Sequence, residues 1–262
     1  MLQCLHGILK VKFMLIKNTG QGKNILPLAV FFYGVHTPAN DNRILRAQPR
    51  YTIINTLHGL WGQIPGNSVM MDVSVYKAAG IRVIGYLTAG YEARGSAGKI
   101  DPQWYTLEMN RKLIKGMAEI DKVDGIFIDE CSSFPDQYSR DYLKTLTDLA
   151  HSYNLITWGN VGEAQFDSWF FTKGGFNLMQ SIENWHGQDL SPVQRDWGLR
   201  IGVTGSNPGY TAQGACKLTV DAWRRGLAYC YICSTGYASL PDWFEEYVKL
   251  LRASVDCIDN TE

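Results

Sequence analysis

The chain lacks several features that would place it in a common functional class. No apolar run in its 262 residues is long enough to cross a bilayer, so we expect no membrane span. Its 25 Lys and Arg residues balance 25 Asp and Glu residues, without a basic stripe or an aromatic-interleaved Lys/Arg run. We therefore expect no nucleic-acid partner. We also expect the protein to be a monomer.

Metal-binding and nucleotide-binding motifs are also absent. His36, His58 and His186 each follow a predicted strand, but no HxH or HExxH spacing occurs among the five His residues. Neither GxGxxG nor GxxxxGK[ST] follows the first predicted strand. We expect no metal and no cofactor.

Cysteine is sparse, and its pattern is not that of a disulfide scaffold. The six Cys residues include a CxxC pair, Cys230 and Cys233, within the apolar, strand-like run LAYCYICST. Redox CxxC pairs sit at helix N-termini, where the thiolate is stabilised. Small buried hydrophobic residues are therefore the better interpretation of this pair.

What the sequence does contain is typical of one globular domain. It is 45% hydrophobic and 19% charged, with 14 Tyr, 8 Trp and 10 Phe residues that suit a core and a cleft for flat ligands such as sugar rings. The first 24 residues do not resemble a secretory signal, because Lys10 and Lys12 interrupt their apolar stretch. We expect an N-terminal extension over 1–26 and a single domain over 27–262, and the sequence assigns no compartment.

From residue 28 onward, short strand-like runs alternate with helical ones. The predicted strands are 28–34, 51–56, 81–88, 123–129, 155–160, 176–182, 199–205 and 227–234. The predicted helices are 68–79, 102–120, 137–153, 211–226 and 240–254, and a polar stretch, VHTPAND, follows the first strand. The strand runs are almost continuously apolar, as in parallel sheets covered on both faces. Eight such units in a chain of this length predict an α/β fold, a single (β/α)8 TIM barrel. A doubly wound open sheet is the rival fold, but the phosphate-binding motif expected of it is missing.

The active sites of such barrels lie at the carboxyl ends of the strands. The run DGIFIDE ends on Asp129 and Glu130, a like-charged pair from which a buried strand gains nothing. A helix cap is the alternative role for this pair, and Ser132 or Ser133 would also serve as that cap. After the sixth strand comes Glu183, and carboxylates from the fourth and sixth strands can face each other across the mouth. A glycosidase needs one protonated acid and one ionised carboxylate beside the scissile bond, so the candidate catalytic residues are Asp129, Glu130 and Glu183.

Polar and aromatic residues that follow the other strands are candidates for binding a sugar. They are Tyr33, Asn55, His58, Tyr86, Tyr91, Arg94, Asn160, Trp185, Asn207 and Tyr237. Structural roles remain open for some of them: Arg94 as a counterion, Asn55 and Asn160 as loop ligands, and Trp185 as a core residue.

Several stretches together resemble the spherulin-4 family of glycoside hydrolases. They are IINTLHG, AAGIRVIGYLTAGYEARG, VDGIFIDE, WGNVG, IENW and GYASLPDWFEEY, which extend from about residue 50 to the C-terminal helix. The resemblance implies a (β/α)8 barrel that cleaves polymers containing α-1,4-linked N-acetylgalactosamine, such as galactosaminogalactan. It places the family's acidic active-site residues on Asp129, Glu130 and Glu183, and it implies secretion. Where family members often have NPG after the second and fifth strands, this chain has NTLHG and NVGE, so the exact sugar stays open.

The linkage that the resemblance implies restricts the mechanism. In an α-linked 2-acetamido galactoside the acetamido group lies on the same face as the leaving group and cannot attack from behind. The enzyme must then supply the nucleophile or an activated water. Our hypothesis is an endo-acting, retaining enzyme with Asp129 as nucleophile, Glu183 as acid/base and Glu130 as a tuning or substrate-holding group, with Glu130 as an alternative acid. The alternatives from other classes are a non-catalytic carbohydrate-binding barrel, a developmental structural protein, and a hydrolase of a different glycan.

Overall fold

The computed structural model describes residues 25–70, 72–90 and 105–259, and its core is a closed parallel barrel. Neighbouring strands pair in sequence order, and Leu28 of the first strand pairs with Cys230 of the last to close the ring. The strands are β1 (Leu26–Phe32), β2 (Pro49–Ile54), β3 (Arg82–Thr88), β4 (Gly125–Asp129), β5 (Ile156–Asn160), β6 (Leu178–Gln180), β7 (Ile201–Ser206) and β8 (Tyr229–Cys233). The predicted (β/α)8 barrel and all eight of its strands are confirmed, each within a few residues of the expected position.

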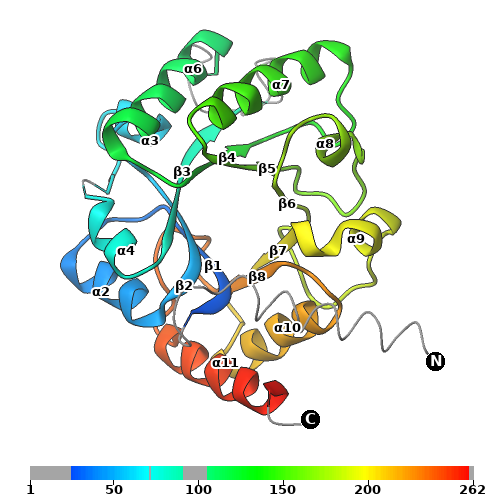
Figure 1. Cartoon of the computed structure of the whole chain (residues 1–262). Coiled ribbons are helices and arrows are strands. Elements are labelled where there is room, and N and C mark those ends of the chain that lie inside the picture. Colours follow the sequence, from blue (N-terminus) through cyan, green and yellow to red (C-terminus); the bar gives the residue numbers. More distant parts are fainter. Residues whose placement is uncertain (1–24, 71, 91–104, 260–262) are drawn as a thin grey trace.

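Helices surround the strands in Figure 1, so each strand is covered on its outer face. They are α2 (Pro38–Ala47), α3 (Leu60–Gln63), α4 (Ser74–Ala78), α6 (Leu107–Gly116), α7 (Gln137–Ser152), α8 (Trp169–Thr172), α9 (Pro192–Trp197), α10 (Ala212–Arg224) and α11 (Phe244–Asp259), with a π turn η2 (Met117–Asp121) and a 3-10 turn η3 (Gly198–Arg200). No helix within the described ranges has the length and apolar content that a bilayer crossing requires.

Aromatic side chains fill the interior of the barrel. Phe31 of β1 lies near the centre, with ring centroids 5.4 Å from Phe127, 6.1 Å from Trp158 and 6.3 Å from Tyr231. All four side chains are buried. The aromatic residues therefore form a packed core inside the barrel, below the carboxyl ends of the strands.

Two helix starts differ from the sequence prediction. The stretch after β1 was predicted only as polar, but it contains the start of α2. The Thr37 side chain accepts a hydrogen bond from the Asn40 backbone N–H, and Pro38 occupies the first turn. The cap of α7 is neither Asp129 nor a serine but Asp136, which accepts from the Ser139 amide at 2.9 Å. The carboxylate pair at the end of β4 is thus not needed to cap the helix that follows.

The CxxC residues Cys230 and Cys233 lie on β8 as buried free thiols. Burial raises the pKa of Cys230 to about 12, which suppresses the reactive thiolate. Their interpretation as small buried hydrophobic residues is consistent with this placement.

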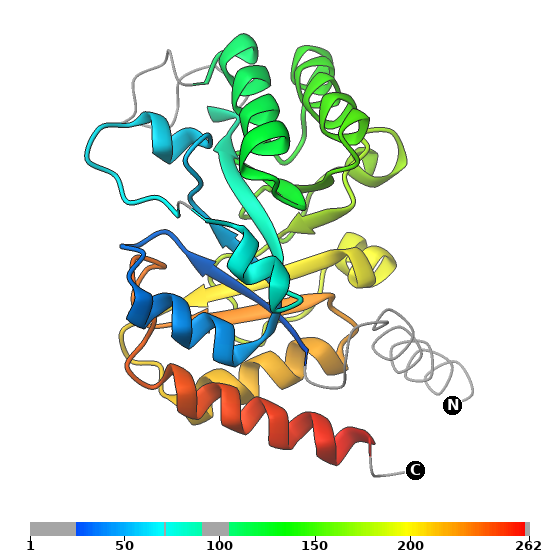
Figure 2. The ribbon, with the colours of Figure 1, turned by 60° about the vertical axis from the view of Figure 1, so that its left-hand side comes forward.

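The first and last helices of the barrel lie side by side, as Figure 2 shows for α2 in blue and α11 in red. Arg43 of α2 donates two hydrogen bonds to the Glu245 carboxylate of α11, from Nε at 2.6 Å and from Nη2 at 2.7 Å. This contact joins the two ends of the described barrel.

Candidate active site

Three carboxyl groups gather at the carboxyl end of the barrel. Asp129 is the last residue of β4, Glu130 follows it, and Glu183 lies three residues beyond the end of β6. These are the three residues that the sequence predicted as catalytic. Asp129 and Glu130 are half-buried, and Glu183 is more exposed.

Asn160, the last residue of β5, lies between the carboxyl groups of the two flanking strands. Its Nδ2 donates to Oδ1 of Asp129 and to Oε1 of Glu183, each at 2.6 Å. These two oxygens are therefore separated by at most twice that distance. The amide oxygen of Asn160 accepts from the Gly162 backbone N–H at 3.0 Å, which fixes the orientation of the amide.

Asp129 accepts more hydrogen bonds than the other two carboxyl groups. Tyr86 Oη donates to its Oδ2 at 2.6 Å, and the Glu130 amide donates to its Oδ1 at 2.9 Å, in addition to the bond from Asn160. Burial raises the pKa of Asp129, while the hydrogen bonds from Tyr86, Asn160 and Glu130 oppose that rise. Asp129 is therefore the carboxylate whose negative charge receives the most hydrogen bonds in the described site.

Glu130 adopts a backbone conformation that side-chain-bearing residues seldom take. Its φ is +55°, in the left-handed region, and Thr88 Oγ1 donates to its Oε2 at 2.9 Å. Burial raises the pKa of Glu130, and the negative charges of Asp129 and Glu183 raise it further. Such strained residues cluster at functional sites, where the surrounding structure holds them in place.

Glu183 makes a single hydrogen bond within the described structure, the one from Asn160 to its Oε1. Desolvation raises its pKa, and the Asp129 charge adds to the rise. Its Oε2 is left without a described partner. A carboxyl group with a raised pKa and a free oxygen suits proton donation.

No basic side chain of the described residues forms an ion pair with these three carboxyl groups. Burial raises the pKa of all three groups, and like charge adds to the rise for Glu130 and Glu183. Two candidate residues, Tyr91 and Arg94, lie outside the described residues.

Aromatic rings form the wall beside the carboxyl groups. Tyr33 packs on Tyr86 with ring centroids 5.1 Å apart, and burial raises the pKa of Tyr33, with the charges of Asp129 and Glu183 adding to the rise. Tyr237 lies 6.4 Å from Tyr33, and its hydroxyl donates to Thr204 Oγ1 at 2.8 Å. Both tyrosines thus stand next to the candidate catalytic residues.

Two candidate asparagines are occupied by loop contacts. Asn55 Nδ2 donates to the carbonyl oxygens of Tyr33 and Ser68, at 3.2 and 3.1 Å. Asn207 is exposed, and its Oδ1 accepts from the Gly209 amide at 2.8 Å. The structure gives neither residue a contact with the carboxyl groups, and loop support accounts for these bonds.

His58 and Trp185 point away from the carboxyl groups. His58 Nδ1 lies 2.7 Å from Asp121 Oδ1, at the end of the π turn η2. Trp185 is fully buried, and its Nε1 donates to the Leu218 carbonyl of α10 at 3.3 Å. The structure therefore places Trp185 in the packing between barrel and helix, the alternative that its sequence left open.

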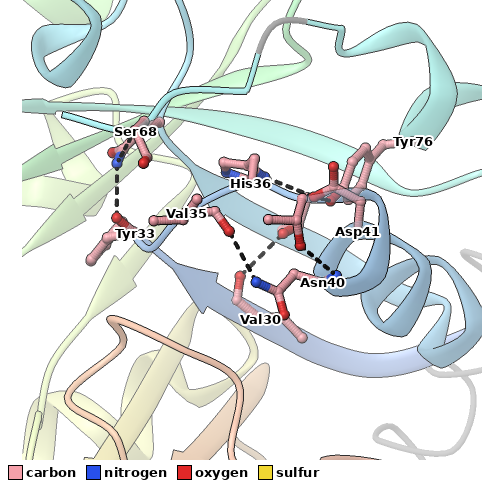
Figure 3. A network of polar contacts seen from close by, with 11 residues as sticks. Val30, Tyr33, Val35, His36, Asn40, Asp41, Ser68 and Tyr76 are labelled. Atoms are coloured by element: carbon pink, nitrogen blue, oxygen red, sulfur yellow. Dashed lines mark hydrogen bonds and ion pairs between the residues drawn. The ribbon is translucent and has the colours of Figure 1, made fainter. Parts of the chain in front are cut away.

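A second polar network lies at the start of α2, where Figure 3 shows His36 and Tyr76 converging on Asp41. His36 Nδ1 lies 2.8 Å from Asp41 Oδ1, and Tyr76 Oη donates to the same oxygen at 2.9 Å. His186 contacts the Asn184 carbonyl. Among the described residues, no three His, Cys, Asp or Glu side chains group as a metal site.

Three further residues that the sequence did not single out contact the carboxyl groups or their partners. Thr88 donates to Glu130, Gly162 orients Asn160, and the half-buried ring of Trp61 packs 5.8 Å from that of Tyr86. Thr88 is the last residue of β3, so the rule applied to Asp129 would have found it. Trp61 lies in the segment after β2, too far beyond the end of the strand for that rule to select it.

The sequence matches no known protein-family model and no curated protein. Solved structures do share its fold. Sph3 of Aspergillus clavatus, crystallised in complex with GalNAc, has 18% identity and a TM-score of 0.58 over 88% of this chain and 97% of its own. The spore cortex-lytic enzyme SleL of Bacillus megaterium has 9% identity and a TM-score of 0.58, over 88% of this chain and 74% of its own.

A third structure, the alpha-L-fucosidase AlfC of Lactobacillus casei in complex with alpha-L-fucose, has 13% identity and a TM-score of 0.51. It covers 89% of this chain and 84% of its own. At such identities the likeness concerns the fold alone. The chain is a (β/α)8 barrel with three carboxyl groups and one bridging amide at its mouth.

Proposed function

We propose that this protein is a glycoside hydrolase that cleaves a polysaccharide containing α-1,4-linked N-acetylgalactosamine or galactosamine. The observation that carries the proposal is the pair of carboxyl groups, Asp129 and Glu183, bonded to the same amide nitrogen of Asn160 at the mouth of the barrel. Hydrolysis of a glycosidic bond needs such a pair, with one group protonated and the other ionised.

The division of roles follows from the hydrogen bonds. Asp129 accepts three, which favour its ionised form against the effect of burial, so it is the nucleophile in our proposal. Glu183 accepts one, has an oxygen without a described partner and carries a raised pKa, so it is the acid/base. Glu130 follows Asp129 directly, and burial together with the charges of Asp129 and Glu183 raises its pKa, so it is the tuning or substrate-holding group in our proposal.

The separation of the pair supports a retaining mechanism. Retaining enzymes hold their carboxyl groups about 5–5.5 Å apart, and inverting enzymes about 6.5–9.5 Å apart. The limit of twice 2.6 Å between the two bridged oxygens agrees with the smaller range. In this mechanism Asp129 bonds to the anomeric carbon while Glu183 protonates the leaving oxygen, and water then releases the sugar from Asp129 as Glu183 takes up its proton.

The choice of sugar is supported by the resemblance to the spherulin-4 family and by the fold shared with Sph3, which was crystallised with GalNAc. Because the 2-acetamido group of an α-linked galactoside lies on the side of the leaving group, it cannot serve as the nucleophile. A protein carboxylate in that role, as Asp129 would provide, suits this linkage.

The test is incubation of the purified protein with acetylated and deacetylated α-1,4-linked galactosamine oligosaccharides, followed by mass spectrometry. We expect shorter products from the wild type and a loss of at least about 10³-fold in rate for Asp129→Asn and Glu183→Gln. Proton NMR of the first product should show the α anomer. Internal cleavage would support endo action, whereas release of terminal units would contradict it.

Two other outcomes correspond to the alternative functions. Binding of the oligosaccharides without cleavage would make the protein a carbohydrate-binding barrel. Neither binding nor cleavage would remove the proposed substrate, and a panel of other glycans would then separate a different hydrolase from a structural protein.

A further inference from the structure

We infer that Asn160 is a positioning residue that holds Asp129 and Glu183 as one unit, and that it is not a ligand of the sugar. The inference rests on the proposed function and assigns a different role to a residue that its sequence position suggested for substrate binding. It depends on what each atom of the Asn160 side chain contacts.

Every polar group of the Asn160 side chain already has a partner. The two N–H bonds of Nδ2 are directed at Asp129 Oδ1 and Glu183 Oε1, each at 2.6 Å. Oδ1 accepts from the Gly162 N–H at 3.0 Å. An amide nitrogen has two donors, so none is left for a sugar hydroxyl while both carboxyl groups are engaged.

The backbone of Asn160 ties it to the segments that carry those carboxyl groups. Its carbonyl oxygen accepts from the Cys131 amide at 2.8 Å, in the segment that follows Glu130. On the other side it pairs with Gln180, the last residue of β6, from which the chain continues to Glu183. Asn160 is also 5% exposed, so its position is fixed by packing as well as by pairing.

This placement suits the movement of charge in a retaining reaction. Before the reaction the negative charge is on Asp129 and the proton on Glu183. When Asp129 bonds to the anomeric carbon and Glu183 gives its proton to the leaving oxygen, the charge passes to Glu183. The pair carries one negative charge throughout, and the Asn160 amide donates to whichever oxygen bears it, without reorganisation.

The test compares Asn160→Ala with Asn177→Ala, a matched loss of an asparagine whose Oδ1 accepts from the Thr157 amide at the opposite end of the barrel. We expect Asn160→Ala to lower kcat about 10²-fold with little change in KM, because the carboxyl groups lose their alignment. Asn177→Ala should leave kcat, KM and the pH profile as in the wild type. A rise in KM at unchanged kcat would overturn the inference, since it would mark Asn160 as a sugar ligand.

A second readout does not depend on turnover. In a carboxyl ¹³C NMR titration, Asn160→Ala should raise the pKa values of both Asp129 and Glu183, because the hydrogen bonds that lower them are gone. Tyr86→Phe removes a donor to Asp129 alone, so it should raise the pKa of Asp129 more than that of Glu183. Asn160→Ser keeps one donor, so it should shift the pair less than Asn160→Ala, and a folded Asn160→Ser decides the question if Asn160→Ala does not fold.

The two readouts separate the inference from the proposed function. If the wild type cleaves no glycan but both pKa values move in Asn160→Ala, the coupling by Asn160 stands and the proposed function fails. If the wild type is active and neither pKa value moves, the inference fails while the proposed function stands.

Discussion

At the residue scale, the three carboxyl groups differ in the number of hydrogen bonds that offset their desolvation. Asp129 receives three hydrogen bonds, whereas Glu130 receives one from Thr88 and Glu183 one from Asn160. Burial raises the pKa of all three groups, and no basic group of the described residues forms an ion pair with them. A carboxyl group whose pKa is raised in the native state lowers stability at neutral pH, where it is ionised in the unfolded chain.

Glu130→Gln tests this cost. Burial raises the pKa of Glu130, so the native protein binds this proton more tightly than the unfolded chain does. The free energy of unfolding therefore falls as the pH rises from the ordinary glutamate value through the raised one. We expect Glu130→Gln to have a Tm about 2 °C above that of the wild type at neutral pH. The difference should vanish at about pH 3, more than one pH unit below the ordinary glutamate pKa, where glutamate is protonated in both states.

Thermal unfolding of both proteins at a series of pH values measures this difference. A Tm difference that does not change with pH would mean that charge is not the cause. A lower Tm for Glu130→Gln at neutral pH would mean that the ionised carboxylate stabilises the fold, against our expectation.

Selecting the polar residues that follow each strand predicted several residues at the mouth of the barrel. It did not predict the direction of every side chain. It identified Asn160 and the two carboxyl groups that this residue bonds, those of Asp129 and Glu183. It also selected His58, which turns towards Asp121 instead. A side chain's direction depends on how the loop turns after the strand, and tertiary packing decides that turn, not local spacing.

At the element scale, the strands were easier to predict than the helices. Continuous apolar runs bounded by polar residues marked each strand, because both faces of a parallel barrel are covered. The predicted helix over 102–120 is instead α6 followed by the π turn η2. Side-chain periodicity does not distinguish i→i+4 from i→i+5 hydrogen bonding, so the sequence carries no clear signal for such a turn.

Within the barrel, β7 leaves space for a large side chain from β8. A Cβ atom built on Gly202 would lie 1.9 Å from Cζ of Tyr229, a buried residue whose hydroxyl donates to Gln180 Oε1 and accepts from Trp158 Nε1. Gly202→Ala therefore forces a rigid, hydrogen-bonded ring to move. We expect a loss of about 3 kcal/mol in the free energy of unfolding, measured by urea denaturation.

Gly214→Ala in α10 is the matched control, because a Cβ there would meet only Thr211 Oγ1, at 3.4 Å. Alanine favours a helix over glycine, so this variant should be as stable as the wild type or slightly more stable. Combining Gly202→Ala with Tyr229→Leu should cost less than the sum of the single changes, since both act on the same space. Additive losses would show that the clash with Tyr229 is not the cause.

At the scale of the whole molecule, the sequence predicted the closed ring from the number of βα units, but not the contacts that join its ends. Strand order follows from the rule that successive βα units lie side by side. The pairing of Arg43 with Glu245 joins residues 202 positions apart, and no local pattern predicts it. Such a long-range contact forms only because the closed barrel brings its first and last helices together.

The contact between α2 and α11 should contribute measurably to stability despite lying at the surface. The Arg43 guanidinium makes two bonds to Glu245, a third to the Pro241 carbonyl at 2.7 Å, and lies 5.7 Å from the centre of the Phe244 ring. An exposed ion pair alone is worth about 0.2–1 kcal/mol, and the added carbonyl bond and ring contact raise the expected value towards its upper end.

Arg43→Ala should therefore lower the free energy of unfolding by about 1 kcal/mol and the Tm by about 2–4 °C. Arg43→Lys should recover little of this loss, because an ammonium group cannot make the paired bonds. Arg46→Ala is the control on the same helix: its side chain is 66% exposed, and its Nη2 lies 3.7 Å from Glu245. An equal loss of unfolding free energy in Arg46→Ala and Arg43→Ala would mean that the charge of α2 as a whole is responsible. The specific contact between Arg43 and Glu245 would then not contribute to stability.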